Sequence, residues 1–134
     1  MEDKKKHFLG NVAQKAIIEN DGKILVCRGI GDKVWEFPGG RLHAGEAPVE
    51  GIAREIREEL GLEIKNIKPF RVEPSFHYKS NMHQVFIAYT CTCENVQIKA
   101  DVTEVEEIRW VSKEELKTLP MFDDCNSVKV SFLL

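Results

Sequence analysis

The chain has 134 residues, of which 43% are hydrophobic and 31% charged, as in an ordinary globular protein. This length suffices to bury one core without disulfides or a structural metal, so residues 1–134 are expected to form a single domain. A formal net charge of −3 and a pI near 5.8 argue against a broad nucleic-acid-binding surface, and no stable nucleic-acid partner is expected.

The ends and the cysteines of the chain indicate its compartment. No apolar run approaches the roughly 20 residues of a membrane span, and the charged start does not resemble a signal peptide. The cysteines lack C-x-x-C spacing and are interpreted as reduced thiols: Cys27, Cys91, Cys93 and Cys125. These features favour a cytoplasmic protein without a membrane partner, whose first eight residues are frayed.

Three extended segments are expected before the first helix, at residues 11–19, 23–28 and 34–37. The Asn-Asp-Gly triplet at 20–22 joins the first two, because Asn and Gly accept the positive φ of a tight hairpin turn. Gly39 and Gly40 follow the third, and they permit a backbone conformation or a close approach that other residues do not.

The strongest helical pattern begins near Ala47, with Pro48 in the first turn and Gly61 as the terminating residue. Its apolar stripe consists of Val49, Ile52, Ala53, Ile56 and Leu60. Charged side chains occupy the opposite face.

The remaining elements alternate between strands and helices. A connector or strand at 62–67, strands at 70–78 and 83–92, an acidic loop at 100–107 and a strand at 108–111 are expected. Ser112 and Glu115 have capping-box spacing for a short helix, and Asp123 or Asp124 is expected to cap a final one. Together the pattern predicts an α/β fold with a central mixed β-sheet between helices.

Three glutamates of the first helix suggest its chemistry. Glu55, Glu58 and Glu59 are related by three- and four-residue steps, so their carboxylates share one face. They lie near the helix C-terminus, where the macrodipole is already negative, and a bound Mg²⁺ or Mn²⁺ would remove their repulsion. Taken alone, the same residues also fit a solvated acidic face.

The surroundings of these glutamates carry a longer motif. Residues 40–62 fit the pattern G-x5-E-x7-R-E-U-x-E-E-x-G-U, where U is a bulky aliphatic residue, at every defined position. These are Gly40, Glu46, Arg54, Glu55, Ile56, Glu58, Glu59, Gly61 and Leu62. The pattern is the Nudix box, and the chain resembles the Nudix hydrolase family over nearly its whole length.

The resemblance implies an α/β/α sandwich and a Mg²⁺-dependent pyrophosphohydrolase acting on a nucleoside diphosphate linked to another group. It implies that Glu58 and Glu59 ligate the metal, that Glu55 is a ligand or the base that activates water, and that the Gly39 carbonyl is a further ligand. In the same way Glu46 and Arg54 are implied to form a structural ion pair that orients Glu55.

Residues outside the box are assigned by the same resemblance. In the MutT-like branch of the family a further metal-binding Glu precedes the strand that ends in Trp; Glu104 fits this place best, with Glu106 and Glu107 as alternatives. Arg28 is a candidate contact to substrate phosphates, with a surface role as the alternative.

The substrate is less well defined. The segment Trp35–Gly40 is similar to that of MutT-like nucleoside triphosphate pyrophosphohydrolases, where an Asn near the last helix reads the base. Asn126 lies close to that place, and Phe37 is either a base contact or a core residue. Tyr78 resembles a Tyr of diadenosine polyphosphate hydrolases, with packing as its alternative role.

Several alternatives remain open at this point. ADP-ribose or nucleotide sugars are alternative substrates, and a non-catalytic nucleotide-binding Nudix domain is an alternative function. The number of bound metals is undefined, and a homodimer is an option because dimers are common among relatives.

Overall fold

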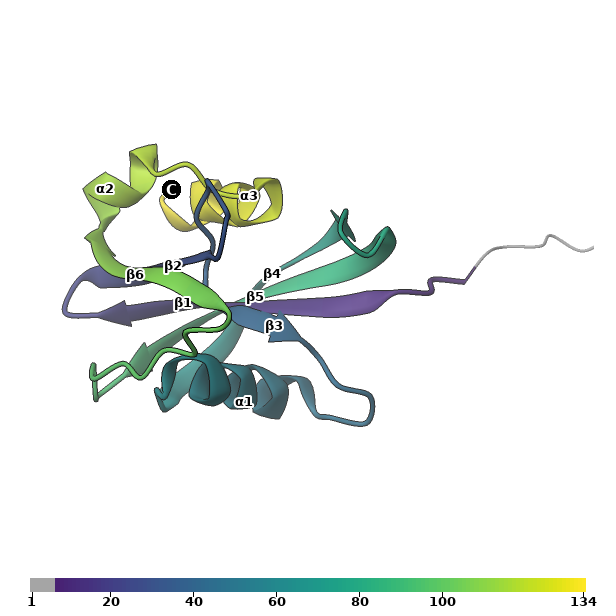
Figure 1. The fold of residues 1–134 in the computed structure, drawn as a ribbon, viewed down its shortest axis with the longest axis horizontal. Coiled ribbons are helices and arrows are strands. Elements are labelled where there is room, and N and C mark those ends of the chain that lie inside the picture. Colours follow the sequence, from purple (N-terminus) through teal and green to yellow (C-terminus); the bar gives the residue numbers. More distant parts are fainter. Residues whose placement is uncertain (1–6) are drawn as a thin grey trace, which may run out of the picture.

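The computed structural model describes residues 7–134 and consists of a mixed β-sheet with helices on both faces (Figure 1). The strands are β1 (Asn11–Asn20), β2 (Lys23–Gly29), β3 (Gly39–Arg41), β4 (Ile64–His77), β5 (Met82–Cys93) and β6 (Val105–Ser112). The helices are α1 (Pro48–Leu60), α2 (Lys113–Thr118) and α3 (Asp123–Phe132). Helix α1 lies on one face and α2 and α3 lie on the other, which confirms the expected α/β sandwich.

The order of the strands leaves room for the glycine-rich segment inside the sheet. The order is β4-β5-β1-β2-β6, with β1 parallel to β5 and antiparallel to β2. β1 and β2 pair next to their turn, and farther along the segment 36–41 lies between them. Glu36 exchanges backbone hydrogen bonds with Cys27 of β2, at 2.8 and 2.9 Å, whereas β3 pairs with β1. The segment is therefore held on both sides by main-chain hydrogen bonds.

Alternate residues of the central strands build a core on each face of the sheet. In β5, Phe86 and Ala88 pack with residues of α2 and α3, whereas Tyr89 and Cys91 pack with residues of α1. The prediction that this strand is covered on both faces is thus confirmed. All four cysteines are buried and free, and the prediction of unpaired thiols is also confirmed.

Three boundaries differ from the sequence-based expectation. β3 was not expected, because a three-residue strand containing two glycines carries no local β signal. The expected connector and strand before residue 78 form the single strand β4, whose pairing with β5 shifts register near Lys65 and Pro69. β6 begins at Val105, which pairs with Gly29, so the acidic loop is shorter than expected.

The capping of the last two helices had mixed outcomes. The Ser112–Glu115 capping box of α2 is present and confirms the prediction. The capping prediction for α3 was wrong, because Phe122 occupies the N-cap position. The Asp124 carboxylate instead accepts hydrogen bonds from Ser75 Oγ, at 3.0 Å, and from the Cys125 backbone N–H, at 2.8 Å.

The predicted fraying of residues 1–8 falls mainly on residues 1–6, which lie outside the described residues. None of the helices within residues 7–134 is long and apolar enough to cross a membrane.

Candidate active site

The acidic end of α1 is bonded to the segment that precedes β6. Ile52, Ile56 and Leu60 are fully buried and fix the helix on the sheet. The helix ends at Gly61 in the left-handed conformation, with φ 67°. The free carbonyls of Leu60 and Glu59 then accept hydrogen bonds from the backbone N–H groups of Lys99 and Asp101, both at 2.8 Å. The loop that carries Glu104 is thereby attached to the end of α1.

The two glycines of β3 allow α1 and β1 each to lie close to the β3 backbone. A Cβ at Gly40 would lie 2.5 Å from the Glu55 carboxyl carbon, so only hydrogen fits there. A Cβ at Gly39, whose φ is 150°, would lie 2.0 Å from the Gln14 carbonyl oxygen. The Glu55 carboxylate is therefore in contact with the backbone of β3.

The expected ion pair between Glu46 and Arg54 is formed. Arg54 Nε lies 2.5 Å from one Glu46 oxygen and its Nη2 lies 3.1 Å from the other. Hydrogen bonds from Arg54, and one from the His43 backbone N–H, lower the pKa of Glu46 to about 2. Arg54 Nη1 also donates to Glu55 at 3.2 Å and to Glu58 at 3.0 Å. One guanidinium therefore joins the loop before α1 to two glutamates of the helix.

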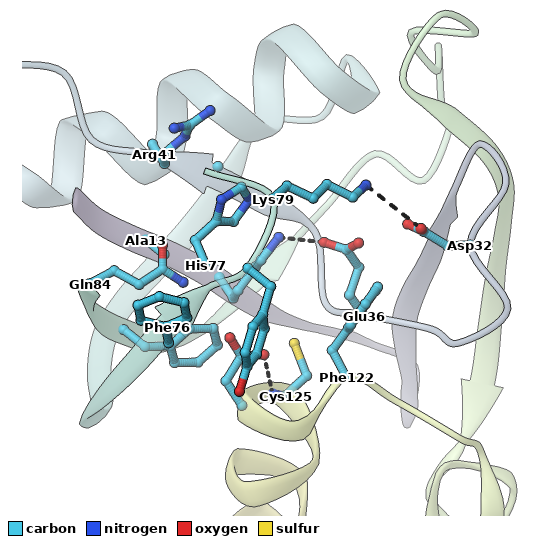
Figure 2. Close-up of a pocket in the computed structure, with 15 residues that line it drawn as sticks. Ala13, Asp32, Glu36, Arg41, Phe76, His77, Lys79, Gln84, Phe122 and Cys125 are labelled. Carbon is cyan, nitrogen blue, oxygen red and sulfur yellow. Dashed lines mark hydrogen bonds and ion pairs between the residues drawn. The ribbon is translucent and has the colours of Figure 1, made fainter. Parts of the chain in front are cut away.

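Two adjoining cavities open beside this network. The larger has a volume of about 360 Å³ and the smaller about 340 Å³, and both are lined by Asp32, Glu36 and Lys79. Glu59 and Glu104 line the smaller cavity. The larger cavity, drawn in Figure 2, is lined by aromatic and polar side chains that include Phe76, Tyr78, Gln84, Phe122 and Asp124.

The carboxylates near the smaller cavity interact strongly. Partial burial raises the pKa of Glu59 to about 7; nearby Lys15 opposes this rise, and the carboxylates of Glu36, Glu55 and Glu104 add to it. Carboxylate oxygens are the type of donor that a hard divalent cation prefers. Among residues 7–134, no three acidic, His or Cys side chains already converge on one point, so the acidic set is open and not a closed cage.

The acidic residues expected to bind metal lie at different places. Glu59 and Glu104 share a cavity, and Glu55 lies against Gly40. Glu58 is more exposed and is directed to Arg54, its side chain being 61% accessible.

The alternatives to Glu104 have other partners. Glu106 and Glu107 both form ion pairs with Arg28, the latter at 3.1 Å. Arg28 also donates to the Asp32 carbonyl at 2.8 Å, lies 5.7 Å from the centroid of the Trp35 ring, and lines neither cavity.

Of the three residues expected to contact the base or nucleoside, only one lines a cavity. Tyr78 lines the larger cavity, is 83% exposed and packs edge-on against Phe76, at 5.0 Å between ring centroids. Phe37 is fully buried in the core, and Asn126 is exposed on α3 outside both cavities. Asp124, two residues before Asn126, lines the larger cavity in its place.

Sequence reasoning missed several cavity residues. Lys15 bonds Glu36 at 2.5 Å within the larger cavity, and Gln84 donates to Ser75 at 3.1 Å, next to Asp124. Lys15 carried a usable signal, because it is a charged residue on the same strand face as the apolar Ala13 and Ile17, each two residues away. Gln84 and Ser75 carried none, since polar residues on strands are usually solvated.

Comparisons with known proteins identify the family of the chain. A family model described as the NUDIX domain matches residues 11–128. Proteins named nucleoside triphosphatase NudI are similar: that of Enterobacter sp. (strain 638) is 34% identical, with 78% of this chain and 84% of the relative covered. That of Escherichia coli O139:H28 is 30% identical, with 75% and 80% covered.

Solved structures show the same fold. A MutT NUDIX hydrolase from Burkholderia pseudomallei has a TM-score of 0.79 at 22% identity, with 90% of this chain and 95% of that chain covered. The E. coli ORF135 protein has a TM-score of 0.74 at 26% identity, with 91% and 88% covered. The motif, the fold and these matches together establish that the chain belongs to the Nudix hydrolase family, and it is a hydrolase that acts on phosphoric anhydrides.

Proposed function

We propose that this hydrolase is a Mg²⁺-dependent nucleoside triphosphate pyrophosphohydrolase that releases a nucleoside monophosphate and pyrophosphate. The observation that carries the proposal is the pair of adjoining cavities, one acidic and one lined by aromatic rings. An acidic cavity suits a metal-bound polyphosphate, and an aromatic one suits a nucleoside. The names of the NudI relatives support the same substrate class.

The residues that would hold Mg²⁺, or Mn²⁺ in its place, are Glu55, Glu58, Glu59, Glu104 and the carbonyl of Gly39. Carboxylate and carbonyl oxygens are the ligands that these cations prefer. When bound, the metal supplies positive charge that neutralises phosphate oxygens and lowers the pKa of a coordinated water.

The reaction is the attack of a water oxygen on a phosphorus of the α,β-phosphate bridge. The new P–O bond replaces the bond to the bridging oxygen, and the proton of the water passes to a carboxylate. Arg54 and the backbone of Gly40 hold Glu55 in one orientation, so that carboxylate is suited to a positional role. Phe76 of β4 and Phe122, directly before α3, line the space for the nucleoside.

A second substrate class is favoured by one observation. Tyr78 stands exposed at the larger cavity, where its ring could stack on a second nucleoside. Dinucleoside polyphosphates are therefore the alternative substrate.

A turnover screen tests the proposal. Nucleoside triphosphates, dinucleoside polyphosphates, ADP-ribose and nucleotide sugars are incubated with the protein and Mg²⁺ or Mn²⁺, and the phosphate products are identified. The expected result is pyrophosphate from triphosphates, reduced by orders of magnitude in Glu59→Gln. The matched control is Glu50→Gln, in the exposed first turn of α1. Full activity in Glu59→Gln, or orthophosphate as the first product, would refute the proposal.

A further inference from the structure

Lys79 lies where the two cavities meet. It belongs to the turn between β4 and β5, lines both cavities, and shares this position with Asp32 and Glu36. Its side chain is 81% exposed, and its Nζ lies 3.9 Å from Asp32 Oδ1, beyond hydrogen-bond distance (Figure 2). Such a lysine has a long flexible stem and is bound weakly to its partner.

The other cations near the site either have stronger bonds or line only one of the cavities. Arg54 is bound by three carboxylates, and Arg28 is bound by Glu106 and Glu107 outside the cavities. Lys15 lies 2.5 Å from Glu36, with its side chain only 16% accessible. Arg41 lines only the larger cavity.

The smaller cavity is acidic, so a weakly bonded cation at its edge is important. Four of its lining residues are acidic, namely Asp32, Glu36, Glu59 and Glu104, and Lys79 is the one cation among the described residues that line it. A polyphosphate entering this space meets repulsion that divalent cations offset on the side of the glutamates. On the side of the β4–β5 turn, Lys79 is the available positive charge.

We propose that Lys79 leaves Asp32 when substrate binds and donates to the phosphate chain at the junction of the cavities. The inference rests on the proposed function. It assigns the β4–β5 turn a direct part in recognising the polyphosphate, a part that sequence similarity suggested for Arg28. It also makes Asp32 a competitor of the substrate for the Lys79 ammonium group.

The test compares Lys79→Met with a matched control, Lys65→Met. Lys65 is on the same strand pair, is also exposed, and forms a similar surface ion pair with Glu94 at 3.2 Å. With the triphosphate substrate, Lys79→Met is expected to raise KM about tenfold, the effect of one charge-assisted hydrogen bond, while kcat changes less than about twofold. Lys79→Arg should restore most of the loss, and Lys65→Met should behave as wild type.

A second variant separates phosphate binding from a structural role of the ion pair. If Lys79 binds phosphate, Asp32→Asn frees it and should leave KM unchanged or lower it. If the ion pair merely holds the turn in place, Asp32→Asn should raise KM as Lys79→Met does. Inhibition by inorganic tripolyphosphate, measured beside inhibition by the nucleoside monophosphate, gives an independent readout. Lys79→Met should weaken the former more than the latter.

The outcomes distinguish the two levels of inference. A wild-type protein without turnover of any triphosphate contradicts the proposed function. A wild-type protein that turns over triphosphate, together with a Lys79→Met variant of unchanged KM and unchanged tripolyphosphate inhibition, overturns the role of Lys79 alone. A parallel rise of KM in Asp32→Asn also overturns it.

Discussion

Gly40→Ala is the sharpest test of how the site is built. The backbone of Gly40 is not in the left-handed region, so alanine is allowed there by its φ. Its added Cβ, however, would lie 2.5 Å from Cδ and Oε2 of Glu55 and 2.7 Å from Oε1. Because ordinary contacts between such atoms are near 3.5 Å, the carboxylate must retreat by about 1 Å.

The size of the effect follows from that displacement. A misplacement of about 1 Å at a reacting group lowers the rate about 100-fold, which corresponds to about 2.7 kcal/mol of transition-state stabilisation. The free energy of unfolding should change by less than about 1 kcal/mol, or about 3 °C in Tm, because the displaced atoms end a flexible side chain. Activity and stability should therefore separate.

The assay is kcat/KM with the substrate identified by the turnover screen, together with thermal unfolding of the same samples. Glu55→Gln and the double variant Gly40→Ala/Glu55→Gln complete a double-mutant cycle. If the alanine acts by displacing Glu55, the double variant should be no slower than Glu55→Gln alone. Fully additive losses, or a Gly40→Ala variant with wild-type activity, would refute the reasoning.

Three further predictions concern the scaffold. Burial lowers the pKa of Lys129, which donates to the Leu119 carbonyl at 2.8 Å, below its ordinary value near 10.5. Between the lowered pKa of Lys129 in the folded protein and its ordinary value in the unfolded chain, the unfolded chain holds more protons. The wild type should therefore gain stability relative to Lys129→Met as pH rises through this window. An equal change of stability with pH in the two proteins, measured by urea unfolding, would contradict this. Tyr89→Phe removes the hydroxyl that accepts from Gln14 Nε2 at 2.7 Å and should cost about 1 kcal/mol in urea unfolding, whereas no loss of stability would contradict this role. Burial raises the pKa of the Cys125 thiol to about 12, so its labelling by a thiol reagent should be slow in the native protein and follow unfolding as urea is added; rapid labelling without urea would count against its burial.

The elements predicted well are those with a strong local pattern. The hairpin turn at 20–22, helix α1 with its end at Gly61, and the capping box of α2 all rest on residues close together in the chain. The errors fall where long-range contacts outweigh local preference. β3 exists because β1 supplies its hydrogen bonds, and the Asp124 carboxylate, instead of capping α3, accepts a hydrogen bond from Ser75 of β4.

For the candidate site, expectations within the motif agree with the structure better than those outside it. The roles assigned to the glutamates stay predictions, but the Glu46–Arg54 pair is present as the motif led us to expect. The contact of Gly40 with Glu55 was not predicted and is known only from the structure. The expected contacts outside the motif agree less well with the structure. Arg28 is occupied by Glu106 and Glu107, and Asn126 lies outside the cavities.

The sequence by itself determined the reaction family, because the residues of the motif lie on one helix and their spacing is fixed by their positions in the chain. Steps of three and four residues put Glu55, Glu58 and Glu59 on one face whatever the rest of the chain does. Only the tertiary structure decided what surrounds them. The hydrogen bonds of Lys99 and Asp101 to the end of α1 bring Glu104 beside Glu59.

The strand order has a similar consequence for the substrate. Because β5 pairs in parallel with β1, with Gln84 opposite Asn11, the β4–β5 turn lies at the end of the sheet where β1 begins and carries Lys79 to the cavities. Such contacts join residues far apart in the chain, and their closeness depends on the pairing of whole strands. No local pattern records that pairing, so the residues that line the cavities beyond the helix are revealed only by the fold.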